Sequence, residues 1–236
     1  MSVEETEVYR ALSSKSRIRI LKLLYRKPLS VDEIAKSLDL QPITVRHHLQ
    51  ALEEAGFIES YEERKGSVGR PKVIYKVAKK TKLVGFPKRR YLLLSDFMIN
   101  TLRFMLGKNK AKKVLEKVGI EIGENTAKKI AAEHQIKEWT LDDYKRAFVE
   151  KYLAEIGAEP EIIKVSKNKI VYRLHNCLFF ELAVKMPEMV CEALHDSFHE
   201  GLANVIGGKV KITRVTCIGE GAPYCEHVCE WVTKKE

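Results

Sequence analysis

The sequence has no uninterrupted apolar run close to the ~18–20 residues that a bilayer span requires. Its 236 residues include only 7 prolines and 13 glycines, too few for a fibrous or low-complexity chain. The first ten residues are acidic and polar, so no basic segment followed by an apolar stretch marks a secretory signal. These absences predict a globular cytoplasmic protein that does not enter a membrane.

Cysteine is missing from the first 176 residues. An odd total of five in a chain expected to be cytoplasmic argues against a disulfide framework. It favours a metal site, a redox site or separately buried thiols. The five residues are Cys177, Cys191, Cys217, Cys225 and Cys229.

Acidic residues are scarce only at the start of the chain. Residues 1–90 hold 20 Lys and Arg against 11 Asp and Glu, whereas residues 91–236 hold 22 against 21. Nearly all of the net charge of +10 therefore lies in the first part. Such asymmetry suggests a segment that binds a polyanion, joined through the basic linker Ala78–Arg90 to one that does not.

The basic segment has the pattern of a helix-turn-helix. Ser16–Arg26 reads as an amphipathic helix, and Ser30 with Glu33 forms a capping box before a short helix, Val31–Leu38. Pro42 suits the first position of the next helix, Ile43–Ala55, which has an apolar stripe and a polar, partly basic outer face. A short helix, a tight turn and a second helix of this kind predict a DNA-reading unit.

Two strand-like runs follow, Phe57–Tyr61 and Val73–Val77, on either side of a loop with two glycines and four cations. This pattern predicts the wing of a winged helix, whose cations reach phosphates or the minor groove.

The stretch VRHHLQALEEAGFIESYEERKGSVGRPKVIYKV resembles winged-helix repressors of the ArsR type and their Suf-operon-repressor relatives, over about residues 8–80. The resemblance implies a homodimer that binds a double-stranded DNA operator. It implies that bases and nearby phosphates are read by Gln41, Thr44, Arg46, His47 and Gln50, and that the DNA backbone is held by Arg64, Lys65, Arg70 and Lys72.

The rest of the chain predicts an α+β fold in three parts. Residues 1–84 are the winged helix-turn-helix, and 85–135 are a helical linker whose apolar residues on more than one face predict a dimer seam. Residues 136–236 form a C-terminal α/β sensor domain that contains the cysteines. Its expected elements are a helix from 141 to 156, strands within 160–175, a helix from 187 to 206, and strands at 209–217 and 224–233.

Four cysteines fall near the ends of these elements. No CxxC pair is present, so the spacing alone is weak support for a metal. Element ends can nevertheless converge, and thiolates bind zinc or iron–sulfur clusters. The candidate ligands are Cys177, Cys191, Cys217 and Cys225; the alternative is that some of them simply pack in the core.

The segment Asn176–Ala183 and the turn Val215–Cys225 resemble a 4-vinyl-reductase-type sensor domain, over about residues 140–233. In that family, cysteines matching Cys191, Cys217 and Cys225 are implied to hold zinc with an acidic residue. That position here is Arg214, which leaves Cys177 or Cys229 as the substitute.

Two related groups imply other chemistry. In Suf-type repressors, cysteines matching Cys177, Cys191 and Cys225 are implied to ligate an iron–sulfur cluster, and methanogen regulators of this layout are implied to use redox switches. Zinc, iron–sulfur cluster and thiol switch stay open, because thiolates serve all three.

Histidines add a further alternative. His195 and His199 follow Cys191 at spacings of four on one helix, which suits either a metal or packed side chains. His227 is expected to point to the opposite face of its strand from the neighbouring cysteines, and hence to be a poor co-ligand.

We therefore expect a DNA-binding transcriptional regulator whose C-terminal cysteines bind a metal or cluster, or sense redox state, and modulate operator binding. No nucleotide-binding glycine motif or Ser/His/Asp pattern indicates an enzyme. The alternatives are a metal-binding accessory subunit of a reductase-type enzyme and a zinc-stabilised small-ligand sensor. Residues that would line a ligand pocket are Leu178, Phe179, Phe180, Leu182 and Val184.

Overall fold

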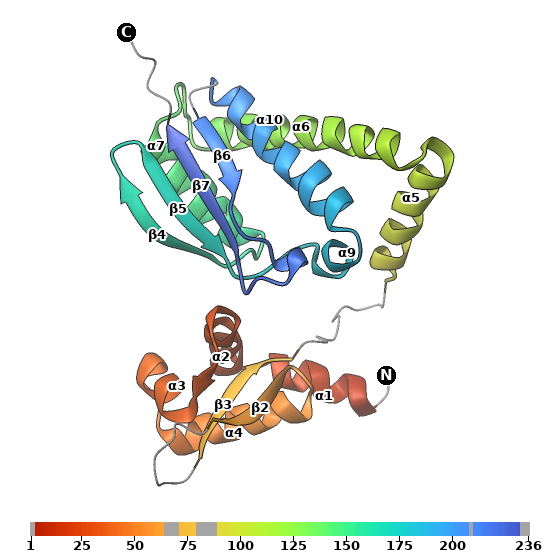
Figure 1. Cartoon of the computed structure of the whole chain (residues 1–236). Helices are drawn as coiled ribbons and strands as arrows, with labels where there is room; N and C mark the ends of the chain where they lie inside the picture. The colour runs from red at the N-terminus through yellow and green to blue at the C-terminus, as the bar shows by residue number, and fades with distance from the viewer. Residues whose placement is uncertain (1–2, 64–70, 79–88, 208–209, 232–236) are drawn as a thin grey trace. The chain divides into compact units, whose positions relative to one another are not determined.

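The computed structural model describes residues 3–63, 71–78, 89–207 and 210–231. The chain divides into two compact units, Met1–Arg89 and Arg90–Glu236 (Figure 1). The helices expected within 85–135 belong to the second unit, where they pack against the sensor domain. None of the helices described is both long enough and apolar enough to cross a membrane.

The first unit is a helix-turn-helix followed by a hairpin, as predicted. Its strands form an antiparallel sheet in the order β1-β3-β2. The elements are α1 (Val3–Leu12), α2 (Lys15–Arg26), β1 (Leu29–Ser30), α3 (Val31–Leu38), α4 (Pro42–Glu54), β2 (Ile58–Glu63) and β3 (Lys72–Val77).

Local sequence explains the helix-turn-helix. The Glu33 N–H donates to Ser30 Oγ (3.4 Å), and the Ser30 N–H donates to the Glu33 carboxylate (2.8 Å), which completes the predicted capping box at α3. Asp39 ends α3 in the left-handed region at φ 54°, and Pro42 begins α4. An apolar core that includes Ile34, Val45 and Leu49 holds the helices together.

The second unit combines a four-stranded antiparallel sheet, in the order β4-β5-β7-β6, with helices. The predicted strands and helices are all present. The helices are α5 (Tyr91–Leu106), α6 (Lys108–Glu133), α7 (Leu141–Asp143), π-helical η1 (Tyr144–Tyr152), α8 (Leu153–Glu155), α9 (Phe180–Lys185), π-helical η2 (Glu188–Asp196), α10 (Ser197–Val205) and 3₁₀ η3 (Ile218–Glu220). The strands are β4 (Pro160–Ser166), β5 (Lys169–Leu174), β6 (Val210–Arg214) and β7 (Cys225–Trp231).

The sheet buries one face against the helices. Alternate residues of β7, namely Cys225, His227 and Cys229, are all buried, and β5 pairs them with residues of its own buried face. The expectation that His227 points away from the cysteines is therefore wrong. Side chains alternate along a strand with a period of two, so residues 225, 227 and 229 share one face.

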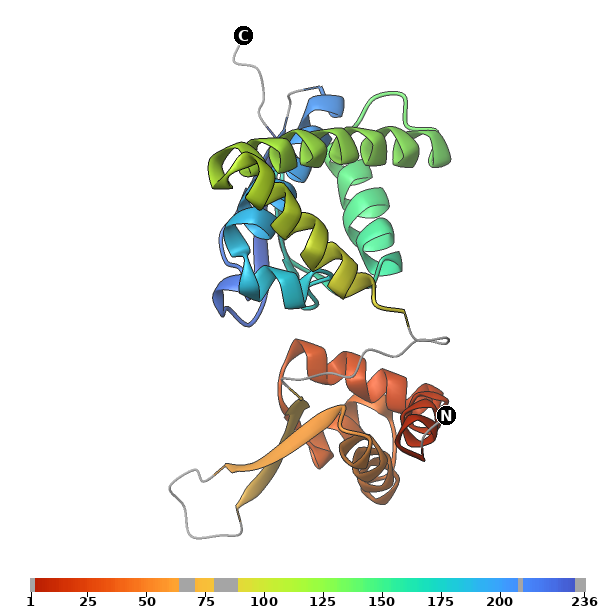
Figure 2. The ribbon, with the colours of Figure 1, turned by 90° about the vertical axis from the view of Figure 1, so that its right-hand side faces the viewer.

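Glycines bring α6 against α10, which lie side by side in Figure 1. A Cβ at Gly123 would collide with the carbonyl oxygen of Phe198, and a Cβ at Gly201 would collide with that of Ile120. The helices therefore meet backbone to backbone, which only glycine permits. Figures 1 and 2 show α5 turning sharply into α6, where Gly107 has a φ of 74°.

Candidate nucleic-acid interface and sensor cavity

The predicted base-reading residues lie at the start of α4 and on its outer side. Arg46, His47 and Gln50 are exposed, as is Gln41 just before the helix, and Thr44 is half-buried. The buried side of α4 carries the apolar stripe, so the helix directs its polar residues to solvent. This placement fits a recognition helix, whose exposed side chains reach base edges.

One of the four predicted phosphate-binding cations is described. Lys72 begins β3, is exposed, and forms an ion pair with Glu33 (Nζ–Oε2 3.2 Å). Arg64, Lys65 and Arg70 lie outside the described residues.

The second unit contains a cavity of about 290 Å³. Its lining is mostly apolar and is contributed by α6, η1, α8, β5, α9, η2, α10, β7 and the segments that connect them. Within the part of the chain that the structure describes, the lining includes no Asp, Glu, Lys or Arg. Of the five predicted pocket residues, Leu178 and Phe179 line it, whereas Phe180, Leu182 and Val184 are not part of the described lining. Such a cavity suits a small apolar ligand.

All four predicted cysteine ligands reach this cavity. Cys177 lies after β5, Cys191 on η2, Cys217 after β6 and Cys225 at the start of β7. The Cys217 side chain interacts with those of both Cys191 and Cys225. The backbone N–H of Ile218 donates to Cys225 Sγ (3.3 Å). Cys217 is therefore the centre of this group, which we call the cavity cysteines.

Burial sets the protonation state of three of the cavity cysteines. It raises the pKa of Cys225 to about 12 and also raises the pKa values of Cys177 and Cys191. These groups are thiols at neutral pH, so forming thiolates would require a bound cation or another compensating charge.

Cys229 is separate from the cavity cysteines. It is fully buried on β7, close to the Tyr144 hydroxyl, and does not contribute to the described lining of the cavity. Burial raises its pKa to about 12. Because it lies on the same strand as Cys225 but outside the described lining of the cavity, Cys229 serves as the control thiol for the cavity cysteines.

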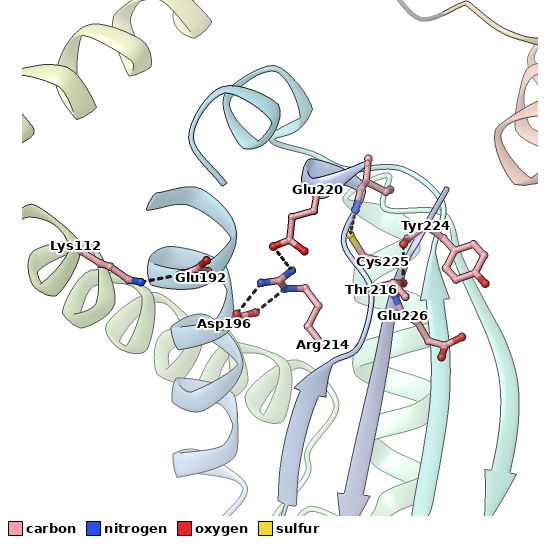
Figure 3. A network of polar contacts seen from close by, with 10 residues as sticks. Lys112, Glu192, Asp196, Arg214, Thr216, Glu220, Tyr224, Cys225 and Glu226 are labelled. Carbon is pink, nitrogen blue, oxygen red and sulfur yellow. Dashed lines mark hydrogen bonds and ion pairs between the residues drawn. The ribbon is translucent and has the colours of Figure 1, made fainter. Parts of the chain in front are cut away.

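Arg214 stands where the resemblance implies an acidic metal ligand. Figure 3 shows its guanidinium donating to both carboxylate oxygens of Asp196, at 2.8 and 2.9 Å. Glu220 lies 3.6 Å from the same group. These bonds raise the pKa of Arg214 above its already high usual value. Because guanidinium has no lone pair to offer, residue 214 is not a metal ligand.

The structure also adds His227 to His195 and His199, the two histidines that the sequence placed together on one helix. His195 on η2, His199 on α10 and His227 on β7 each place a ring nitrogen within 4.8 Å of the others. Two of them line the cavity. The missed signal was the even spacing of Cys225, His227 and Cys229, which puts His227 on the helix-covered face.

Family models match both units. Residues 14–60 match the model described as bacterial regulatory protein, arsR family. Residues 88–228 match the model described as L-2-amino-thiazoline-4-carboxylic acid hydrolase.

Individual proteins resemble the chain as well. An uncharacterized HTH-type transcriptional regulator of Methanocaldococcus jannaschii is 39% identical over 74 residues, which cover 31% of this chain and 76% of that protein. A fragment of a possible transcriptional regulatory protein from Mycobacterium bovis is 25% identical, with a TM-score of 0.28, over 41% of this chain and 91% of its own. The phenol-responsive sensory domain of the activator PoxR is 15% identical, with a TM-score of 0.47, over 82% of this chain and 92% of its own.

Proposed function

The chain belongs to the L-2-amino-thiazoline-4-carboxylic acid hydrolase family through residues 88–228 and to the HTH-type transcriptional regulators of the arsR family through its first unit, and on this premise we propose that its cavity cysteines control DNA binding. The first unit makes the protein a DNA-binding transcriptional regulator. The second unit, in this proposal, is its sensor, in keeping with the 4-vinyl-reductase-type resemblance of its cysteine segments.

One observation carries the proposal: thiols from four separate segments of the chain line a single cavity that is otherwise largely apolar. Thiols respond to two classes of signal, because they coordinate soft metals or clusters as thiolates and they oxidise reversibly. Either event draws together or separates the elements that carry the thiols. The cavity cysteines can therefore convert a chemical signal into a change of shape.

Ion pairs connect the cysteine-bearing helix η2 to the beginning of α6. Lys108 Nζ lies 2.6 Å from Glu188, and Lys112 Nζ lies 2.7 Å from Glu192 (Figure 3 shows the second pair). The adjoining helix α5 follows the interdomain linker in sequence. A shift of η2 would thus be passed to α5 and would change how the two DNA-binding units of a dimer are spaced.

A second copy of the chain is the proposed partner of α5. None of the sixteen residues of this helix is buried, although most are apolar. Phe104 is 92% exposed, Met105 74% and Met98 65%. An apolar surface of this kind indicates an interface, and a two-fold symmetric dimer matches the palindromic operators that helix-turn-helix proteins read.

Sedimentation measurements test the dimer. The wild-type protein is expected to sediment as a dimer and Phe104→Lys as a monomer, because the lysine charge opposes burial of that surface. Lys117→Ala, on the exposed side of α6, is the control and should stay dimeric. A wild-type monomer at tens of micromolar, or a dimeric Phe104→Lys protein, would remove α5 as the seam.

The cysteine proposal is tested by anaerobic purification followed by metal and sulfide analysis and a visible spectrum. Iron with acid-labile sulfide would identify a cluster, stoichiometric zinc lost on cysteine substitution a zinc site, and reversible thiol oxidation without metal a redox switch. In each case Cys217→Ser should abolish the property and Cys229→Ser should keep it. A Cys217→Ser protein that behaves as wild type in all three respects would overturn the proposal.

The family's name favours hydrolysis as a second candidate function. Against it, the described lining of the cavity offers no charged side chain to a substrate that carries both a carboxylate and a basic nitrogen. We therefore expect no loss of 2-amino-thiazoline-4-carboxylate when it is incubated with the protein. Turnover that disappears in Cys217→Ser would establish the enzyme instead.

A further inference from the structure

Three histidine rings meet beneath the sheet, each from a different element. The ring centroids of His195 and His199 are 4.8 Å apart, those of His199 and His227 are 4.8 Å apart, and those of His195 and His227 are 5.6 Å apart. One nitrogen of each ring lies within 4.8 Å of the others. Among the described residues, these three form the one group of at least three His, Cys, Asp or Glu side chains whose potential ligand atoms lie this close together.

Two of these rings are buried without any hydrogen-bond partner. His199 is 3% exposed and His227 is fully buried, and all four of their ring nitrogens are unsatisfied. A buried polar group left without a partner destabilises the fold, and such groups are uncommon in native structures. Ring contacts with Tyr172 and Phe148 account for the packing of the rings but not for their nitrogens.

The state of the rings suits a transition metal. Burial lowers the pKa of His195 to about 4 and the pKa values of His199 and His227 well below their usual range, so all three imidazoles are neutral at neutral pH. Neutral imidazole is the ligand that Zn²⁺, Fe²⁺, Ni²⁺ and Cu²⁺ share. The nearby positive charge of Arg214 is already balanced by its bidentate pair with Asp196.

We propose that His195, His199 and His227 form a binding site for a divalent transition metal, zinc being the type case, distinct from the cavity cysteines. The site does not depend on whether the cysteines sense anything. Three protein ligands leave a coordination position for water or for a ligand donor atom. Because His195 and His199 also line the cavity, a small molecule that enters the cavity has access to this centre.

Cobalt titration of the full chain tests the proposal. The protein is treated with chelator, reduced, and titrated anaerobically with Co²⁺ while the absorption spectrum is recorded. We expect one equivalent of Co²⁺ that gives visible d–d bands without a thiolate-to-cobalt charge-transfer band. This signal should survive in Cys217→Ser and be lost in His199→Gln. Any charge-transfer band in the wild type would report the cavity cysteines separately.

Melting curves keep the test independent of folding defects. Excess Zn²⁺ is expected to raise the melting temperature of the wild type by about 5 °C over its value in chelator. In a Cys217→Ser background, where the cavity cysteines lack their central thiol, His199→Gln should melt like its parent in chelator and gain nothing from Zn²⁺. If His199→Gln does not fold, His195→Gln, whose ring is half-buried, replaces it.

His175→Gln is the matched control. His175 is a buried histidine of the same unit, but its Nε2 is bonded to Glu161 (2.8 Å) and it lies outside the cluster. It should bind Co²⁺ as the wild type does. No Co²⁺ or Zn²⁺ binding by the wild type, or binding whose only spectrum carries the charge-transfer band and vanishes in Cys217→Ser, would overturn the site. DNA binding unaffected by metal would leave the site standing.

Discussion

The two units of the chain differ in where their functional side chains lie: those of the first unit are exposed to solvent, and those of the second are mostly buried. In the first unit, the described core is apolar apart from Ser30, and the cations and polar residues of α4 face solvent. In the second unit, three histidines and four of the five cysteines are buried, and most of the described ion pairs lie at the surface, Arg214 being the covered exception. Binding a polyanion requires exposed charge, whereas holding a metal or a small molecule requires donors removed from water. The contrast separates DNA recognition from sensing.

The largest expected effect unfolds one unit without the other. Gly201→Ala should destabilise the second unit by about 3 kcal/mol, since its Cβ meets only the rigid backbone around Ile120. Both tryptophans, Trp139 and Trp231, lie in this unit, so their fluorescence follows its denaturant unfolding alone. Lys117→Ala is the control and should change little.

Circular dichroism follows both units in the same titration. The transition of the first unit should stay where it is in the wild type. A loss of stability shared equally by both units would show that they do not behave as separate compact bodies.

The next effect tests whether the exposed residues of α4 bind DNA. Arg46→Glu should weaken binding to an operator selected from a random DNA pool by about tenfold or more, and it should flatten the salt dependence. Fluorescence anisotropy at several salt concentrations measures both. Lys117→Glu makes the same charge change on α6 and should have a much smaller effect. An equal loss of DNA affinity in the two variants would show that net charge, and not the position of Arg46 on α4, determines binding.

A smaller effect concerns acid stability of the first unit alone. Bonds from Ser30, followed by Lys72, lower the pKa of Glu33 from its usual 4.5 to about 2. The ionised carboxylate is therefore stabilised on folding, so its contribution is present above about pH 4.5 and is lost as the pH falls toward 2. Glu33→Gln should remove this part of the pH dependence.

Circular dichroism at pH 7 and pH 3 measures the stability of the first unit, which contains no tryptophan and is therefore not followed by tryptophan fluorescence. Ser30→Ala removes one half of the capping box and should cost the first unit about 1 kcal/mol at neutral pH. A Glu33→Gln protein with an unchanged acid profile would show that other carboxylates dominate it.

The same contrast explains what the sequence predicted. The first unit follows from local signals, because the capping box at Ser30, Pro42 at the start of α4 and the apolar stripe each act within a few residues. The cysteine grouping followed from element ends. The close approach of α6 and α10 at Gly123 and Gly201 and the meeting of three histidines depend on packing between distant segments, which local patterns do not encode. His227 was misplaced only because the strand period was misapplied.

The most direct test asks whether the buried cysteines of the second unit control DNA binding by the first. It measures the affinity of the full chain for its selected operator with the cavity cysteines in two states. The reduced, metal-free protein is compared with the oxidised or metal-loaded one. Coupling of about tenfold is expected in the wild type and in Cys229→Ser, and none in Cys217→Ser. Equal affinity in both states of the wild type, or coupling that persists in Cys217→Ser, would contradict control of DNA binding by the cavity cysteines.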